Sequence, residues 1–269
     1  MDQRWDTRQP CYLRALAREC GLEISSVHTP FGVIAGPGWD GDQISRIRRT
    51  VELAGDVGAR VVVVHLPMRW QELTIRLSGC RSDLWLPTLL PRDAELRKWL
   101  LTGLRELEAA SGVCIGVENM PLSTRWRHLR VNRFQLNDPR RPLEHISRYP
   151  HLTLDTTHLA TWGVDALGFY KLARDKVVNI HLSNYRDGLE HALPWAGEIP
   201  LSRFVEHLHE DGYEGNLVIE LHPGALGAKD EEAVRRNLAR CAHFCRQPSS
   251  HSDEAIASRR GDQGLLRSG

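Results

Sequence analysis

Residues 152–163 read LTLDTTHLATWG: an apolar run, Leu152–Leu154, ends directly in Asp155, and His158 follows three residues later. Five other short runs rich in β-branched residues have the same form. Each is apolar on both faces, which is typical of parallel strands covered by helices. The six predicted strands are Ile24–Val27, Val61–Val64, Val113–Val117, Leu152–Leu154, Val177–Ile180 and Leu217–Ile219.

Segments with helical spacing alternate with these strands, which predicts an α/β fold with a parallel sheet or barrel. Apolar residues recur at helical intervals after Asp42 and again before Gly112. Further helices are expected at 11–20, 142–148, 165–174, 201–211 and 230–245. Two strand-to-helix connections, 66–92 and 119–141, are longer than usual, and long loops of this kind commonly serve a site. We expect one domain over 1–246 and a disordered tail over 247–269, which has little apolar content.

Composition narrows the class of protein. The chain has 269 residues and a formal net charge of +1, which argues against binding nucleic acid by bulk electrostatics. Its six cysteines form no C-x-x-C pair, so neither a zinc ribbon nor a disulfide framework is indicated. The first residues have no apolar leader segment, and no run is long enough to cross a membrane. We therefore expect a cytoplasmic protein without a membrane partner.

Each predicted strand ends in a side chain that can bind a metal or move a proton. Because the carboxyl ends of parallel strands form one rim, these side chains should converge. Carboxylates and imidazoles in one crevice repel or desolvate one another unless a cation binds them. We interpret this pattern as a metal site, formed by residues drawn from His28, His65, Glu118, Asp155, His181 and Glu220.

Seven ordered motifs resemble the xylose isomerase-like TIM barrels, over about residues 11–245. They are ISSVHTP, VVVVHLP, IGVENM, LTLDTTHLATWG, VNIHLSN, HALPWAGEI and LVIELHP. This family includes sugar phosphate isomerases and epimerases and also endonuclease IV. In the family the ISSVHTP-like strand is the third, so the resemblance implies a TIM barrel that lacks its first two strands. We expect six strands, an open barrel, and a start codon assigned too far downstream.

The epimerase branch implies one divalent ion, commonly manganese, bound by Glu118, Asp155, His181 and Glu220. Zinc, magnesium and cobalt are compatible with the same ligands. In that branch the two glutamates also act as the acid/base pair, and His158 matches a histidine that contacts the substrate. The implied reaction is isomerisation or epimerisation of a sugar or sugar phosphate by proton transfer through an enediolate.

The endonuclease IV branch implies a multinuclear zinc phosphodiesterase that acts on abasic DNA. It would use His28 and His65 with Glu118 as a bridge, and His158 with His191 at a third metal. That third metal also needs an aspartate two residues before His191, where this chain has Leu189. Two nearby carboxylates have a different spacing: Asp187 and Glu190. His28, His65 and His191 therefore remain candidates for a second metal or for substrate contact. A non-catalytic metal-binding barrel is a third reading.

Substrate clues come from residues outside the strand ends. Arginines dominate the segment after Glu118, and near a metal they favour an anionic substrate, although salt bridges with Asp138 and Glu144 explain them equally well. Arg186 and Trp70 are candidate substrate-binding residues. We expect a small sugar or sugar phosphate as the partner rather than nucleic acid. The residues leave open which sugar is used, and whether the chain forms a homo-oligomer.

Overall fold

The computed structural model describes residues 10–30, 39, 41–76, 83–87, 94–126 and 129–246, which divide into two compact units. The first unit extends to Leu154 and also contains Phe169–Asn179. The second unit contains Asp155–Gly168 and the chain from Ile180 onward. The boundaries fall within strands and a helix, so each unit holds its own part of the α/β architecture.

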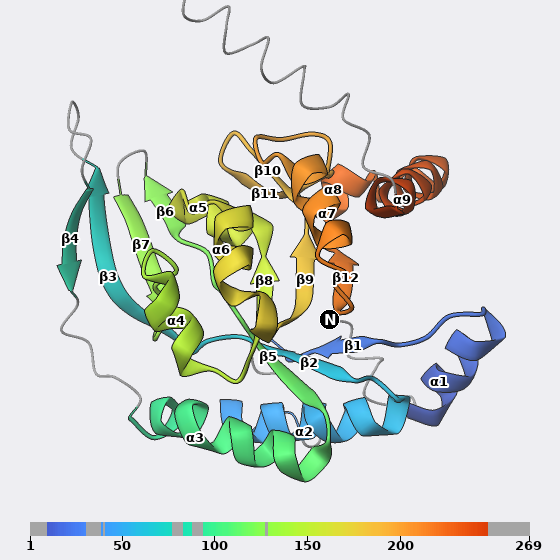
Figure 1. Cartoon of the computed structure of the whole chain (residues 1–269), viewed down its shortest axis with the longest axis horizontal. Helices are drawn as coiled ribbons and strands as arrows, with labels where there is room; N and C mark the ends of the chain where they lie inside the picture. Colours follow the sequence, from blue (N-terminus) through green and yellow to red (C-terminus); the bar gives the residue numbers. More distant parts are fainter. Residues whose placement is uncertain are drawn as a thin grey trace, which may run out of the picture. The chain divides into compact units, whose positions relative to one another are not determined.

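Six strands form the main sheet, in the order β1-β2-β5-β8-β9-β12 (Figure 1). The pairs β1–β2, β2–β5 and β5–β8 are parallel. The sheet ends at β1 and β12, so within the described part of the chain it is open and has six strands, as predicted. Their bounds are β1 (Ser26–His28), β2 (Val61–Val64), β5 (Cys114–Glu118), β8 (His151–Asp155), β9 (Val177–Leu182) and β12 (Asn216–Ile219).

Burial follows position in the sheet. All four valines of β2 are buried, whereas every residue of the two edge strands β1 and β12 is only half-buried. The first strand lies two residues later than predicted at its start, because pairing with β2 begins at Ser26 opposite Val61. The shift brings His28 into the strand as its last residue.

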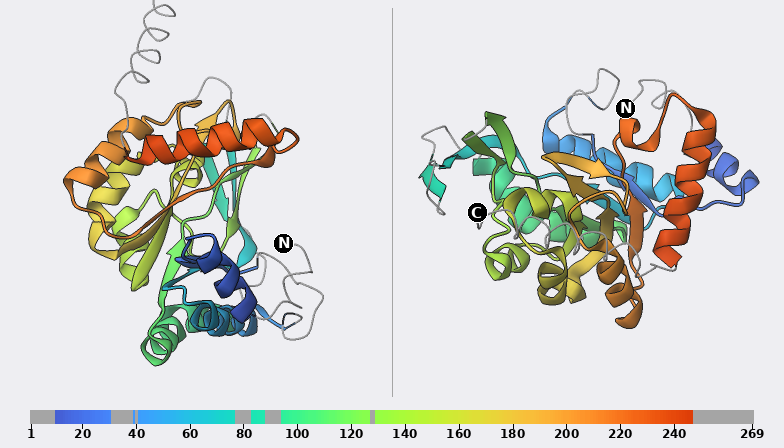
Figure 2. Two further views of the ribbon diagram at one scale, coloured as in Figure 1. Left: turned by 90° about the vertical axis from the view of Figure 1, so that its right-hand side faces the viewer. Right: turned by 90° about the horizontal axis from the view of Figure 1, so that it is seen from above.

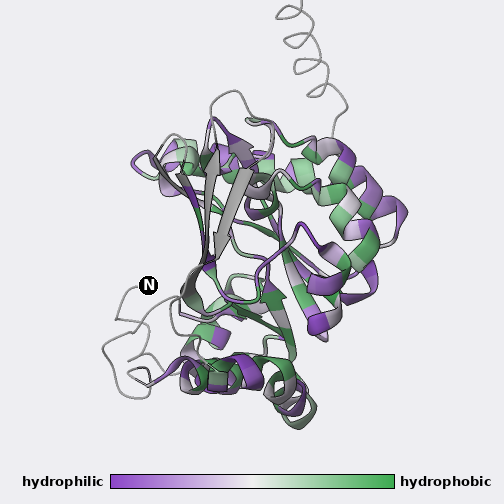
Figure 3. Ribbon diagram, turned by 90° about the vertical axis from the view of Figure 1, so that its left-hand side faces the viewer, coloured by the Kyte–Doolittle hydropathy of each residue, from purple (hydrophilic) through white to green (hydrophobic). Residues whose placement is uncertain are grey.

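Helices cover the sheet of the first unit. The Asp42 side chain accepts a hydrogen bond from the Ser45 amide and begins α2 (Gln43–Val57), and Gly58 ends it in the left-handed region at φ 85°. Helix α2 lies beside α3 (Ala94–Ser111), and α1 (Pro10–Glu19) lies beside α2 (Figures 1 and 2). Both α2 and α3 carry apolar and polar residues on different faces (Figure 3). Their apolar faces supply the buried side chains of these helices.

The two long connections carry a second sheet, which the sequence did not predict. Four antiparallel strands pair in the order β4-β3-β7-β6. The four are β3 (Met68–Arg76), β4 (Asp83–Pro87), β6 (Ser123–Trp126) and β7 (Leu129–Phe134). Antiparallel strands of this kind alternate polar and apolar residues, so they lack the continuous apolar runs that marked the parallel strands. Helix α4 (Pro142–Arg148) follows in the same unit, as predicted.

The second unit contains short elements between longer helices. Helix α5 (Thr156–Trp162) follows Asp155 directly, and β10 (Asn184–Arg186) pairs with β11 (Leu189–Ala192) in an antiparallel hairpin. Arg240 of α9 (Glu231–Arg246) lies 3.9 Å from the centre of the Trp195 ring. The other helices are α6 (Ala166–Ala173), which crosses the unit boundary, α7 (Leu201–Glu210) and α8 (Pro223–Leu226). No helix among the described residues has the length and hydropathy needed to cross a membrane.

Candidate functional site

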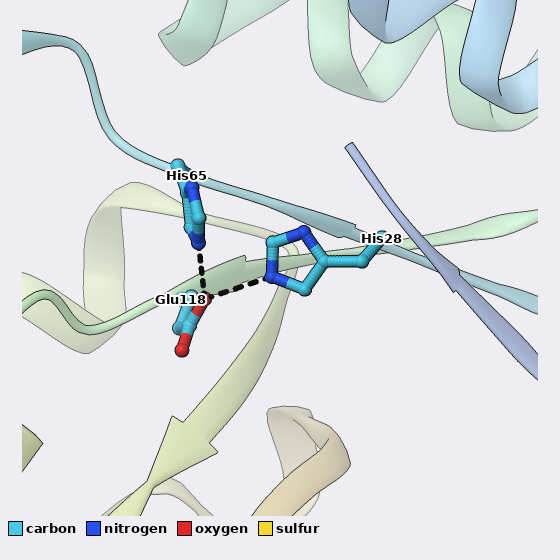
Figure 4. Close-up of side chains that lie close together, drawn as sticks. All are labelled: His28, His65 and Glu118. Carbon is cyan, nitrogen blue, oxygen red and sulfur yellow. Dashed lines mark hydrogen bonds and ion pairs between the residues drawn. The ribbon is translucent and has the colours of Figure 1, made fainter. Parts of the chain in front are cut away.

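His28, His65 and Glu118 lie together in the first unit (Figure 4). The Nε2 atoms of His28 and His65 lie 3.3 and 2.9 Å from the same carboxylate oxygen, Oε2 of Glu118. The two imidazole rings meet edge to face, with centroids 4.4 Å apart. Glu118 ends β5 and is buried, whereas both histidines are partly exposed. The predicted convergence of these three strand ends is therefore present in this unit.

The orientation of His28 defines what the trio can bind. Its Nδ1 lies 2.8 Å from the carbonyl oxygen of Thr29, and since a carbonyl only accepts, Nδ1 is the donor. In a neutral imidazole, Nε2 then carries a lone pair directed at the Glu118 carboxylate. A cation between them, either a proton or a metal, is required to make this contact attractive. Metal-ligating histidines commonly donate their other ring N–H to a backbone carbonyl in this way.

Three further strand-end residues come together in the second unit. Nδ1 of His181 lies 2.7 Å from Oε2 of Glu220 and 3.8 Å from Oδ2 of Asp155. Asp155 and His181 are buried, and the Glu220 side chain is 42% exposed. Two carboxylates therefore flank one imidazole nitrogen. This set of oxygen and nitrogen donors suits a divalent cation such as manganese, magnesium, cobalt or zinc.

Local structure fixes Asp155 in this group. One of its carboxylate oxygens, Oδ1, caps α5 by accepting hydrogen bonds from the His158 amide and the Thr157 hydroxyl, each at 2.8 Å. The other oxygen, Oδ2, lies on the side of His181 and His158. The D-T-T-H order therefore lets one aspartate begin a helix and present an anionic oxygen to two imidazoles. Helix α5 ends at its C-cap residue Gly163, which adopts the left-handed conformation with φ 71°.

His158 and His191 form the outer part of this group. Their rings meet edge to face at 5.4 Å, and both lie with Asp155 in a set that could hold an ion. His191 has φ 61°, a left-handed conformation that is uncommon for residues other than glycine, and its Nδ1 lies 3.2 Å from the Ser183 hydroxyl. Such local strain is concentrated at functional sites.

Glu190 is a carboxylate near His158, where the resemblance expects an aspartate from position 189. Its Oε2 lies 3.7 Å from Nε2 of His158, whereas the Asp187 side chain is exposed and pairs with Arg186. Burial raises the pKa of the Glu190 carboxyl, and this effect exceeds the opposing influence of His158 and His191. Leu189, where the resemblance expects an aspartate, is exposed. Of the two substitutes considered from the sequence, Glu190 is the one near His158.

The remaining sequence predictions are placed as follows. Arg186 lies on β10 with its side chain 64% exposed. The backbones of Trp70 and Arg125 belong to β3 and β6, but nothing is described of their side chains. The tail 247–269 and Arg127 of the basic segment lie outside the described residues. In that same segment Arg140 binds Asp138 at 2.7 Å, and Arg141 lies 3.5 Å from Glu144. These two arginines therefore form the salt bridges that compete with an anion-binding role.

The first unit holds a further group of potential ligands that was not predicted from the sequence: Glu108, Cys114 and His151. These residues lie at the beginning of strands or at the end of a helix. The strand-end signal that identified the other groups does not apply there.

Comparisons with known proteins agree with this architecture. A family model described as xylose isomerase-like TIM barrel matches residues 1–242. An uncharacterised protein of Mycobacterium tuberculosis (strain ATCC 25618 / H37Rv) is 28% identical over 254 residues, which cover 87% of this chain and 81% of that protein. An uncharacterised protein of Mycobacterium leprae (strain TN) is 28% identical over 242 residues, or 81% of this chain and 76% of that protein.

Two solved structures show the same fold. D-Psicose 3-epimerase with D-tagatose, from Clostridium cellulolyticum H10, has a TM-score of 0.62 at 15% identity, covering 88% of this chain and 82% of that one. The apo form of 3-keto-D-glucoside 4-epimerase from E. coli has a TM-score of 0.59 at 21% identity, covering 90% and 87%. At these identities the likeness is one of fold.

Proposed function

The chain belongs to the xylose isomerase-like TIM barrel family, and from that premise we propose that it is a metal-dependent isomerase or epimerase acting on a sugar or sugar phosphate. The observation that carries the proposal is the group in the second unit, in which Asp155 and Glu220 flank Nδ1 of His181. The fold likeness to two sugar epimerases supports the same reaction class.

Glu220 and Asp155 of this group and the neighbouring His158 have different tasks in the proposed reaction. A bound divalent ion would polarise a substrate carbonyl and so acidify the neighbouring carbon. Glu220 has the more exposed of the two carboxylates, so it would be the residue that reaches a substrate and takes up the proton. Asp155 is buried and held by α5, and it contributes a fixed negative charge. His158, in the first turn of α5, would contact a substrate hydroxyl, which is the role that the sequence resemblance implies for it.

Glu118 stays a prediction as the fourth ligand and the second member of the acid/base pair. It belongs to the first unit, and the sequence resemblance implies these roles for it. Manganese as the metal, Arg186 and Trp70 as substrate contacts, a homo-oligomeric state and a cytoplasmic location likewise stay predictions.

The experiment that tests the proposal combines metal analysis with isotope exchange. Purified protein is analysed for bound metals and then incubated with a panel of ketohexoses, pentuloses and their phosphates in D₂O. Proton transfer next to a carbonyl places deuterium on that carbon, which NMR detects even where the equilibrium between epimers is unfavourable. We expect about one manganese, cobalt or magnesium per chain and deuterium in at least one sugar.

Two variants test whether the deuterium exchange depends on Glu220. Glu220→Gln should keep the fold, weaken metal binding and abolish exchange. Glu210→Gln, which changes an exposed carboxylate on α7, is the matched control and should behave like the wild type. Unchanged metal affinity in Glu220→Gln would remove Glu220 from the ligand set. Exchange that survives in this variant would refute its role as the proton acceptor.

A second candidate function is metal-dependent phosphodiester hydrolysis on abasic DNA. The observation that favours it is the trio of His28, His65 and Glu118, which a single-metal epimerase does not need. Glu190 beside His158 supplies a carboxylate near a third position, although at a spacing different from the family pattern. Two or three zinc ions per chain, together with cleavage of an abasic-site oligonucleotide, would favour this function over the first.

A further inference from the structure

Glu108, Cys114 and His151 form a compact cluster within the first unit. Oε1 of Glu108 lies 2.6 Å from Nδ1 of His151 and accepts a hydrogen bond from the Ile115 amide at 2.7 Å. One ligand atom from each of the three residues lies within 4.8 Å of the others. All three side chains are partly exposed. The cluster therefore offers sulfur, nitrogen and oxygen donors that solvent can reach.

The sheet register explains why these side chains meet. Gly116 of β5 pairs with His151 of β8, so Cys114, two residues before Gly116, projects from the same face as His151. Glu108 comes from the last turns of α3 and is aimed by its bond to the Ile115 amide. Cys114 begins the strand that Glu118 ends. The cluster thus lies at the opposite end of β5 from the trio of His28, His65 and Glu118.

We infer that Glu108, Cys114 and His151 form a binding site for a thiophilic divalent cation, of which zinc is the natural example. Cysteine, histidine and a carboxylate are the ligand types that zinc takes in proteins, and three of them leave one position for water. The thiolate distinguishes this site from the oxygen- and nitrogen-only group of Asp155, His181 and Glu220, which manganese and magnesium also suit. This site is independent of the proposed enzymatic function.

The chemistry of binding is an exchange of a proton for the cation. Burial and the Glu108 carboxylate raise the pKa of the Cys114 thiol, so Cys114 keeps its proton at neutral pH in the metal-free protein. In that state a hydrogen bond joins His151 and Glu108 directly. When the cation binds, the thiol proton leaves to solvent, and the single proton of the neutral His151 imidazole is carried on the ring nitrogen that does not bind the cation. The cation then links the end of α3 to the beginnings of β5 and β8.

Cobalt is the probe, because a cobalt–thiolate bond gives a ligand-to-metal charge-transfer band in the near ultraviolet that oxygen and nitrogen ligands lack. Chelator-treated full-length protein is first saturated with Mg²⁺ and then titrated with Co²⁺ under reducing conditions. We expect a charge-transfer band that reaches its plateau with one thiolate per cobalt. Zn²⁺ should displace the cobalt and protect Cys114 from alkylation.

Four variants test which residues bind the cobalt that gives the charge-transfer band. Cys114→Ser should abolish it, and Cys20→Ser, which changes an exposed cysteine elsewhere in the unit, should retain it. Glu108→Gln keeps an acceptor for the Ile115 amide, and His151→Asn changes the imidazole alone. Each should weaken cobalt binding by more than about tenfold while leaving the circular dichroism spectrum unchanged. A wild-type protein without the band, or a band that persists in Cys114→Ser, would overturn the inference. Wild-type affinity in both Glu108→Gln and His151→Asn would overturn it as well, even where Cys114→Ser does not fold.

Discussion

Replacing Asp155 with asparagine and with alanine should separate its role in folding from its role in binding. An asparagine side chain would keep Oδ1, which accepts from the His158 amide and the Thr157 hydroxyl, but would put a neutral NH₂ in place of Oδ2. An alanine side chain would lose both oxygens. We therefore expect Asp155→Asn to be nearly as stable as the wild type but unable to bind the metal tightly, and Asp155→Ala to lose both properties.

The magnitudes follow from the contacts. Loss of a helix N-cap costs about 1 kcal/mol. Leaving the buried Thr157 hydroxyl without its acceptor costs roughly 1–3 kcal/mol more. Asp155→Ala should thus lower the free energy of unfolding by about 2–4 kcal/mol, and Asp155→Asn by less than about 1 kcal/mol. The control Thr157→Val removes only the hydroxyl bond and should cost about 1 kcal/mol.

Two measurements check this pair of variants. Urea denaturation in the presence of a chelator gives the stability of the metal-free protein, and calorimetric titration with Mn²⁺ gives the affinity. We expect Asp155→Asn to bind Mn²⁺ more than about tenfold more weakly than the wild type. Alanine and asparagine variants of equal stability would refute the capping argument. Wild-type Mn²⁺ affinity in Asp155→Asn would refute the role of Oδ2 as a ligand.

Three further predictions concern other parts of the chain. Burial lowers the pKa of His145 to about 4, so the unfolded chain binds more protons than the folded one between pH 4 and 6.5. The protein should lose about 3 kcal/mol of stability over that range as pH falls, and His145→Phe should flatten the profile in urea titrations at each pH. Gly116→Ala would place a Cβ 2.5 Å from Oγ1 of Thr153 and should cost about 1–3 kcal/mol, which Gly116→Ala/Thr153→Ala should partly restore in thermal melts. His28→Ala and His65→Ala should leave deuterium exchange into a sugar within about threefold of wild type if one metal suffices, whereas a loss as large as in Glu220→Gln would indicate a multinuclear centre.

The parallel strands could be predicted from the sequence because they coincide with short segments rich in aliphatic and β-branched residues. Val61–Val64 is observed with its predicted bounds, and its four side chains are all buried. The antiparallel sheet in the two long connections could not be predicted in this way. Its strand Leu129–Phe134 contains Arg130, Asn132 and Arg133, a composition that indicates a loop when only apolar runs are counted. The Asn132 side chain is buried and donates to the Asn137 carbonyl, which satisfies a polar group inside the fold.

Of the candidate sites too, some could be predicted from the sequence and one could not. Strand ends converge by topology, so the six strand-end residues, among them Asp155, His181 and Glu220, could be expected to lie on one rim from their positions alone. Glu108 and His151 are 43 residues apart, and neither ends a strand. Their contact depends on how the last turns of α3 meet the first residues of β5, and that packing has no local signature in the sequence.

Charge balance distinguishes the two strand-end groups from each other. In the trio a single carboxylate, that of Glu118, faces two imidazoles, His28 and His65. In the second unit two carboxylates, those of Asp155 and Glu220, lie beside Nδ1 of His181, and Asp155 is completely buried. Two carboxylates attract a divalent cation more strongly than one does, and solvent ions screen this attraction less where a carboxylate is buried. The second unit should therefore bind its metal first, and a titration followed in His28→Ala/His65→Ala should reproduce the tightest binding step of the wild type.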